Sequence, residues 1–219
     1  MRSPLGNRVA LPVWGSADSV VVTRRAERKR ETAETSITVT VELDGDGRVE
    51  VDTGLPFFDH MLSQLGRHAG LDLTVAAQGD LDIDAHHTVE DTGITLGMAL
   101  AEAWGDKVGV RRFANTAVPL DEALVTCALD LSGRPFLVYE IDPPGEKILG
   151  DPPFDPQLCE EFWRALATSA RVTLHFDMVR GRNTHHVIEA SFKAFARALR
   201  EAVRVEGGEV PSTKGTLSS

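Results

Sequence analysis

HHTVE at residues 86–90 and HHVIE at residues 185–189 share one pattern and lie 99 residues apart in a chain of 219 residues. A His-His-x-x-Glu pattern is expected by chance about 0.02 times in a chain with this histidine and glutamate content. Each copy opens a stretch with the apolar spacing of a helix, over 86–104 in one case and about 185–205 in the other. The two copies therefore predict an internal duplication, with one motif in each half.

Hydrophobic periodicity predicts a similar order of elements around each motif. In the first half, strands are expected over 36–43, 48–51, 71–77 and 81–84, and helices over 56–70 and 86–104, the second of which begins with the first motif. The DGDG sequence at 44–47 predicts a hairpin turn with 48–51 as the returning strand. Further along, strands are expected over 123–131, 134–141 and 171–178, and helices over 157–170 and 185–205, with Asn183 as a plausible N-cap. The order strand–strand–helix–strand–strand–helix is expected twice, with three of the four strands of the second half located by the pattern.

This order predicts an α+β fold with two internally duplicated, two-layer halves, each a small sheet with helices on one face. The halves are placed at about 24–110 and 111–205, and the last residues have the composition of a loop. Residues 1–23 are expected to form a flexible extension. The charged run RRAERKR (24–30) is expected to be solvated in the same way.

Composition narrows the classes of function. The formal net charge of −10 argues against a protein that coats nucleic acid. The chain contains no run of eighteen apolar residues that would span a membrane, and its first twenty residues lack the apolar core of a secretory signal. The two cysteines, Cys127 and Cys159, do not form a disulfide framework, which fits a reducing, cytoplasmic compartment.

Helix geometry limits how the two motifs can bind metal ions. Successive helical residues point about 100° apart, so adjacent histidines do not easily bind one ion, whereas residues four apart share a face. We expect each histidine–glutamate pair four apart to chelate one ion, and the other histidine of each motif to reach a second ion. The pairs are His86 with Glu90 and His185 with Glu189, and the other ligand candidates are His60, His87, His175 and His186. Sets rich in nitrogen with one carboxylate suit Mn²⁺, Fe²⁺ or Zn²⁺.

Basic and hydroxyl residues outside the motifs are candidate phosphate contacts. Lys193 follows Glu189 by four residues, so it projects from the same helix face toward the metal. Arg112 and Arg134 lie at expected loop or strand edges, and Ser212-Thr213-Lys214 forms a small cluster of hydroxyls and an amine. Such a set could clamp a phosphate group.

The chain resembles imidazoleglycerol-phosphate dehydratases over about residues 24–217. The double HHxxE together with FxDHM and SGRP is specific to that family. The stretches that carry the resemblance are RRAERKRETAETSITVTVELDGDG (24–47), TGLPFFDHMLSQLGRHAGLDL (53–73), DAHHTVEDTGITLGMAL (84–100), GVRRFANTAVPLDEAL (109–124), LDLSGRP (129–135), LHFDMVRGRNTHHVIEASFKAFARALREA (174–202) and PSTKGTL (211–217).

The resemblance implies a fold like the second domain of ribosomal protein S5, with a mixed four-stranded sheet and helices in each half. It implies a cytoplasmic lyase of histidine biosynthesis, which dehydrates D-erythro-imidazole glycerol phosphate to imidazole acetol phosphate with two Mn²⁺ per active site. It also implies a homo-oligomer, a 24-mer in the family, with sites at subunit interfaces. Neither a nucleic acid nor a membrane is an expected partner.

The same resemblance assigns roles to individual residues. One ion is held by His60, His87, His185 and Glu189. The other is held by His86, Glu90, His175 and His186. Substrate contacts fall on Glu34, Gln64, His68, Arg112, Arg134, Lys193, Ser212, Thr213 and Lys214. The catalytic candidates are Glu34, Glu90 and Glu189, with Glu34 as the acid/base.

Three other functions remain as alternatives. A dinuclear hydrolase would use similar ligands, but it normally needs bridging carboxylates that hold two ions close together. A helical-bundle metal store uses Glu-x-x-His motifs on four helices, whereas this chain reverses that order and alternates helices with strands. An RNA-binding module is suggested by fold similarity to a ribosomal protein alone, and the negative charge opposes it.

Overall fold

A computed structural model describes residues 24–144 and 149–217, so the extension expected over 1–23 lies outside the described residues. The first half contains β1 (Arg25–Glu31), β2 (Thr35–Glu42), β3 (Val49–Asp52), α1 (Pro56–Ala69), β4 (Asp72–Gly79) and α2 (His86–Trp104). The second half contains β5 (Phe113–Leu120), β6 (Ala123–Asp130), β7 (Phe136–Glu140), α3 (Leu158–Ala170), β8 (Thr173–Arg180) and α4 (Thr184–Ala202).

The two halves have the same sheet topology. The strand orders are β1-β2-β4-β3 and β5-β6-β8-β7. In each sheet the first two pairings are antiparallel, and the last pairing, β3 with β4 or β7 with β8, is parallel. The predicted duplication into mixed four-stranded sheets is therefore confirmed, but each half follows the order strand–strand–strand–helix–strand–helix and not the expected one.

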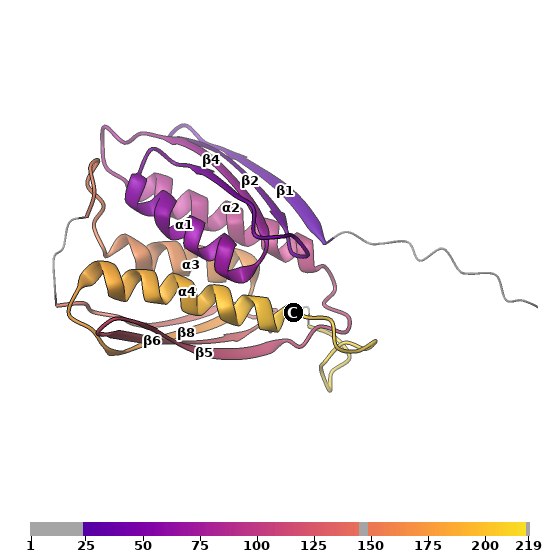
Figure 1. Cartoon of the computed structure of the whole chain (residues 1–219). Coiled ribbons are helices and arrows are strands. Elements are labelled where there is room, and N and C mark those ends of the chain that lie inside the picture. Colours follow the sequence, from indigo (N-terminus) through magenta and orange to yellow (C-terminus); the bar gives the residue numbers. More distant parts are fainter. Residues whose placement is uncertain (1–23, 145–148, 218–219) are drawn as a thin grey trace, which may run out of the picture.

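The helices occupy the middle of the molecule, and the two sheets cover them from outside (Figure 1). Helix α2 packs on α3, and α1 packs on α4. Each sheet thus has one face on the helices, as expected, which explains the strict alternation of buried and more exposed residues along β2. A single half would leave its helices uncovered on one side, so the hydrophobic core is completed only when the halves pack together.

Aromatic side chains from α3 link the helices of the two halves. Phe162 and Trp163 are fully buried. The Phe162 ring lies 5.3 Å from that of Phe58 on α1, and the Trp163 ring lies 4.6 Å from that of Phe192 on α4. Aromatic pairs at these separations contribute stability beyond their buried area. This cluster sits beneath α1 and α4, the helices that carry the site described below.

Two glycines let α2 approach α3 closely. A Cβ atom on Gly93 would lie 2.7 Å from the carbonyl oxygen of Phe162, and one on Gly97 would lie 2.7 Å from that of Leu166. Residues four apart share a helix face, so Gly93 and Gly97 form one contact surface. The absence of side chains there sets the distance between the halves.

The substitution Gly97→Ala is expected to destabilise the fold by about 1–3 kcal/mol, because the added methyl group overpacks the contact between α2 and α3. Alanine is intrinsically the better helix former by about 1 kcal/mol, so a loss of stability shows that the close approach dominates. Urea unfolding of the metal-free protein measures the change. The matched control is Gly207→Ala, where a Cβ meets nothing within 4 Å. Stability of Gly97→Ala equal to or above that of the parent would contradict the prediction.

The run 24–30 is not a solvated tail, as was expected, but belongs largely to β1, which pairs with β2 from Arg25 to Glu31. Only Ala26 among the residues of β1 is buried. Charged side chains on an edge strand protect it from pairing with other chains, and the same charges make the strand look like a tail in sequence.

Two other expected strands are corrected. Residues 81–84 form a turn, in which the amide of Ile83 donates to the carbonyl of Asp80, and Ile83 is 71% exposed. The strand at 48–51 exists as β3, but it pairs in parallel with β4 and forms no hairpin with β2. The Asp72 side chain accepts hydrogen bonds from the amides of Asp46 and Arg48, which directs the chain toward β4.

Helix boundaries agree more closely with expectation. Helix α1 ends before Gly70, which adopts a left-handed conformation with φ of 72°. The Asn183 side chain caps α4 by accepting a hydrogen bond from the amide of His186, but α4 ends at Ala202 and not at Val205.

Both cysteines are free and buried. Among the described residues, no helix has the length and apolar character needed to cross a membrane.

Candidate metal and phosphate sites

Helices α1 and α4 bring three of the predicted metal ligands together. His60 comes from the second turn of α1, and His185 and Glu189 come from the first turns of α4. One ligand atom of each side chain lies within 4.8 Å of the other two. Glu189 is buried, with 8% of its surface exposed, and both histidines are more accessible. The cluster therefore has a buried carboxylate at its base and two imidazoles at its opening.

The two oxygens of Glu189 have different partners. Its Oε2 atom lies 3.2 Å from Nε2 of His60 and 3.0 Å from Nε2 of His185. Its Oε1 atom lies 2.6 Å from Nζ of Lys193, one helical turn further along α4. Burial would raise the pKa of Glu189, but hydrogen bonds from Lys193, His60 and His185 outweigh it and lower the pKa to about 2. Two ring nitrogens and an ionised oxygen therefore converge, a donor set that fits Mn²⁺, Fe²⁺ or Zn²⁺.

A polar stripe continues from this cluster along α1. Gln64 and His68 follow His60 at intervals of four residues, and Nε2 of His68 lies 3.1 Å from Oε1 of Gln64. Burial and the nearby positive charges of Lys193 and Arg197 lower the pKa of His68. Neutral His68 is thus favoured where α1 faces the basic residues of α4.

The first HHxxE motif lies at the start of α2, with different partners. Nε2 of His86 is 4.0 Å from Oε2 of Glu90, so this pair shares a face as expected. His87 points elsewhere, and its Nδ1 atom lies 3.0 Å from Oδ2 of Asp80 and 3.8 Å from Oε2 of Glu34. The hydrogen bond with Asp80 is the main cause of a raised pKa of His87. His87 is therefore not part of the cluster around Glu189 within one chain.

The second motif shows the same division between its two histidines. His185 joins the cluster, whereas Nδ1 of His186 lies 2.8 Å from Oε2 of Glu122. Glu122 also accepts hydrogen bonds from the backbone amides of Arg182 and Asn183, at 3.1 and 2.7 Å. The His186 hydrogen bond, followed by those two amides, lowers the pKa of Glu122 to about 2.

Across residues 24–144 and 149–217, His60, His185 and Glu189 form the one group of three or more histidine, cysteine or acidic side chains with metal-binding spacing. The predicted ligands outside that group are His86, His87, Glu90, His175 and His186. His175 lies on β8 and lines a separate groove on the sheet of the second half. Neither four-residue set expected from the sequence is complete within one chain.

Five of the predicted phosphate contacts surround a common pocket of about 570 Å³. Its lining includes Arg112, Arg134, Ser212, Thr213 and Lys214. The Arg112 guanidinium donates to both carboxylate oxygens of Asp130, at 2.7 and 3.2 Å, and to the carbonyl of Pro211 at 2.8 Å. Arg112 thus ties the C-terminal segment to the sheet, and the pocket concentrates positive charge.

The phosphate-type pocket and the histidine cluster lie at opposite ends of α4. The amide of Arg112 donates to the carbonyl of Ala202, the last residue of α4, whereas His185 is in its first turn. The 17 residues from His185 to Ala202 span about 25 Å at the helical rise. Lys193 belongs to the cluster and not to the pocket. A small phosphorylated molecule therefore cannot touch both places within one chain.

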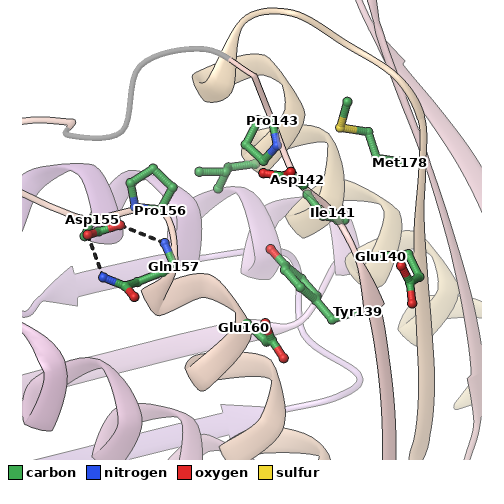
Figure 2. A pocket seen from close by; sticks show the side chains of 11 residues that line it. Tyr139, Glu140, Ile141, Asp142, Pro143, Asp155, Pro156, Gln157, Glu160 and Met178 are labelled. Carbon is green, nitrogen blue, oxygen red and sulfur yellow. Dashed lines mark hydrogen bonds between the residues drawn. The ribbon is translucent and has the colours of Figure 1, made fainter.

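Another cavity, of about 580 Å³, lies beside the end of β7 and the start of α3 and is shown in Figure 2. None of the predicted site residues lines it. The side chains at its rim include Glu140, Asp142, Asp155 and Glu160. Four carboxylates disfavour the approach of a phosphate group, so this cavity does not fit a phosphorylated ligand.

Three carboxylates were missed in the sequence: Asp80, Glu122 and Asp130. Each partners a predicted site residue, respectively His87, His186 and Arg112. A signal for Glu122 is present, because it directly precedes β6 as Glu34 directly precedes β2. Aligning the halves by their strands, and not only by their histidine motifs, would have found it.

The fold and the site together define the class as an internally duplicated α+β protein, in which each half carries a histidine–carboxylate contact at the start of a helix. A family model described as imidazoleglycerol-phosphate dehydratase matches residues 53–199. The imidazoleglycerol-phosphate dehydratase of Halorhodospira halophila is 56% identical over 197 residues, which cover 89% of this chain and 98% of that protein. That of Acidothermus cellulolyticus is 54% identical over 195 residues, covering 89% and 93%.

Solved structures agree with this relationship. The crystal structure of imidazoleglycerol-phosphate dehydratase from Staphylococcus aureus superimposes with a TM-score of 0.74 at 38% identity, covering 83% of this chain and 99% of that one. The chain belongs to the imidazoleglycerol-phosphate dehydratase family.

Proposed function

We propose that the chain removes water from D-erythro-imidazole glycerol phosphate to give imidazole acetol phosphate, a step of histidine biosynthesis, with two Mn²⁺ per active site. Membership of the family over nearly the whole chain carries this proposal. The convergence of His60, His185 and Glu189 supports the dependence on metal. Bound Mn²⁺ would supply Lewis-acid stabilisation of negative charge on the substrate imidazole.

Three side chains that lie together would hold one ion, and the remaining predicted ligands would hold a second ion. His60, His185 and Glu189 would hold one ion, with His87 as the fourth ligand. His86, Glu90, His175 and His186 would hold the other. Lys193 would keep Glu189 ionised and oriented through its contact with Oε1, which leaves Oε2 toward the ligand site. Glu90 and Glu189 would thus contribute to catalysis as ligands.

Dehydration removes one proton and one hydroxyl group from the substrate, so side chains of the protein must accept the proton and protonate the departing hydroxyl group. Glu34 is the proposed group, because its carboxylate is about half exposed and lies 3.8 Å from Nδ1 of His87. It would take the proton from the carbon that keeps its hydroxyl group, one position away from the ring, while the hydroxyl group on the carbon next to the ring departs and is protonated to water. The resulting enol then tautomerises to the ketone. Near-normal turnover of Glu34→Gln would remove Glu34 from this role.

The proposed site is assembled from more than one chain. The phosphate-type pocket and the histidine cluster are about 25 Å apart along α4, a distance that one small substrate does not bridge. A homo-oligomer, proposed to be the 24-mer, would place the pocket residues of one chain next to the cluster of another. Gln64, His68 and Lys193 would then contact the substrate from the chain that supplies the cluster.

The first test is to strip the protein with a chelator, restore Mn²⁺, and assay conversion of imidazole glycerol phosphate to imidazole acetol phosphate. Turnover that requires the metal is expected. Full turnover without metal would contradict the metal dependence. Absence of turnover in the Mn²⁺-loaded, assembled protein would contradict the assignment of the substrate.

A further inference from the structure

We infer that Asp80 and Glu122 are positioning residues, which accept a hydrogen bond from Nδ1 of His87 and His186 and so leave Nε2 of each ring free to bind a metal ion. The inference rests on the proposed function, in which these two histidines are metal ligands. It adds the groups that decide which ring nitrogen faces the ion.

Glu122 has the geometry expected of such a group. Its Oε2 atom lies 2.8 Å from Nδ1 of His186. Its Oε1 atom is held by the backbone amides of Arg182 and Asn183, which precede α4. A carboxylate can only accept hydrogen bonds, so Nδ1 must carry the ring proton, and the lone pair remains on Nε2. Oδ2 of Asp121 lies 3.9 Å from Nε2, which is beyond hydrogen-bonding distance.

Asp80 makes the corresponding contact in the first half. Its two oxygens lie 3.0 and 3.2 Å from Nδ1 of His87, so this ring also carries its proton on Nδ1. Carboxylates that hold the second nitrogen of a metal-binding histidine fix both the tautomer and the ring orientation. The same arrangement therefore occurs at the second histidine of both HHxxE motifs.

Asp80 and Glu122 come from loops at different places in the two halves. As a result, Glu34 and Glu122, which occupy equivalent positions, have different contacts. Glu122 directly precedes β6, and the equivalent residue before β2 is Glu34. In the first half, it is Asp80, from the loop between β4 and α2, that contacts Nδ1 of the histidine. Glu34 stays 3.8 Å from that nitrogen and is 53% exposed. Its carboxylate is thus not held by the imidazole, as Glu122 is, and is available for proton transfer.

The substitution Glu122→Gln gives the sharpest test. The two backbone amides keep Oε1 as their acceptor, so the glutamine NH₂ group takes the place of Oε2 and faces Nδ1 of His186. An amide NH₂ can only donate, which forces Nδ1 to accept and moves the ring proton to Nε2. We expect a fall of about 10–100-fold in Mn²⁺ affinity at the ion that His186 binds. Electron paramagnetic resonance of free Mn²⁺, titrated against the metal-free protein, measures that affinity without an activity assay.

Two control variants separate orientation of the ring from charge and from stability. Asp121→Asn removes the same charge one residue away, 3.9 Å from Nε2 and without touching Nδ1, so its effect on Mn²⁺ affinity measures the contribution of charge and should be smaller than that of Glu122→Gln. Gly97→Ala destabilises the fold at the contact between α2 and α3 and should leave the affinity unchanged. A clearly larger loss of Mn²⁺ affinity in Glu122→Gln than in either control supports a positioning role. Equal losses in Glu122→Gln and Asp121→Asn would overturn it, because charge would then be the cause.

Asp80→Asn is expected to lose less affinity than Glu122→Gln. Both oxygens of Asp80 face Nδ1, so the asparagine can turn its remaining oxygen toward the ring and keep the tautomer. Wild-type affinity in both variants, with two Mn²⁺ bound and normal turnover in the parent, would overturn this inference and leave the proposed function standing. A parent protein that binds no Mn²⁺ would instead contradict the metal-dependent function itself, and the inference with it.

Discussion

Replacing Glu189 with glutamine is expected to reduce both turnover and Mn²⁺ affinity at the α1–α4 cluster by more than about 100-fold, beyond the loss typical of a group that only orients a ligand. Glutamine keeps the shape of the side chain but removes the negative charge on which His60, His185 and Lys193 converge. The Lys193 ammonium group, 18% exposed, then faces the ion site without its counter-charge. Mn²⁺ titration of the metal-free protein and steady-state kinetics measure the two effects.

The control for this variant is Glu201→Gln on the same helix. Glu201 pairs with Arg111 and Arg204 near the C-terminal end of α4 and does not contact the cluster. Exposed ion pairs contribute about 0–1 kcal/mol, so Glu201→Gln should keep near-normal metal binding and turnover. If Glu189→Gln bound Mn²⁺ as the parent does, the cluster would not be a metal site.

The second large effect is expected at Arg112. Hydrogen bonds to charged groups contribute about 1.5–3 kcal/mol, so Arg112→Ala should raise KM for the phosphorylated substrate by about 10–150-fold. The substitution removes a guanidinium from the pocket and also releases the carbonyl of Pro211, just before Ser212, Thr213 and Lys214. Steady-state kinetics and competition by inorganic phosphate measure the change.

The neighbouring Arg111 supplies the matched control. Its side chain pairs with Glu201 and Glu206 and does not line the phosphate-type pocket, so Arg111→Ala should leave KM nearly unchanged. Equal effects of both variants would contradict a specific phosphate contact at Arg112.

Mixed oligomers of Arg112→Ala and Glu189→Gln chains add a test of assembly. If each site takes its phosphate pocket from one chain and its histidine cluster from another, some sites in the mixture contain an intact pocket and an intact cluster. Activity in the mixture well above that of either variant is expected, and its absence would contradict a shared site.

Several elements were predictable because local patterns determine them. The limits of α2, from His86 to Trp104, and the end of α1 before Gly70 follow from apolar spacing and from a glycine in the left-handed region. The pairing of His185 with Glu189 follows from helix geometry alone. The mixed sheet in each half came from the resemblance to the family and not from periodicity.

Other features depend on contacts that a local pattern does not contain. The strand β3 looks like half of a hairpin, but the Asp72 side chain and the parallel pairing with β4 place it elsewhere. The run that contains β1 has the composition of a solvated tail, and only its partner β2 makes it a strand. The turn at 81–84 alternates like a strand, yet none of the strands in the described part of the chain pairs with it.

The sequence by itself determined the duplication, the helix faces and the identity of the histidines and glutamates, because these are encoded in spacing along one chain. Only the tertiary structure decided that His60 meets Glu189 across α1 and α4, and that Asp80 and Glu122 turn His87 and His186. It also decided that Arg112 lies at the far end of α4 from His185. The physical reason is that His60 and Glu189 are distant in sequence, as are Glu122 and His186, and each pair meets only when the elements pack around one shared core. Asp80 and His87 are close in sequence, but the turn between them sets their contact.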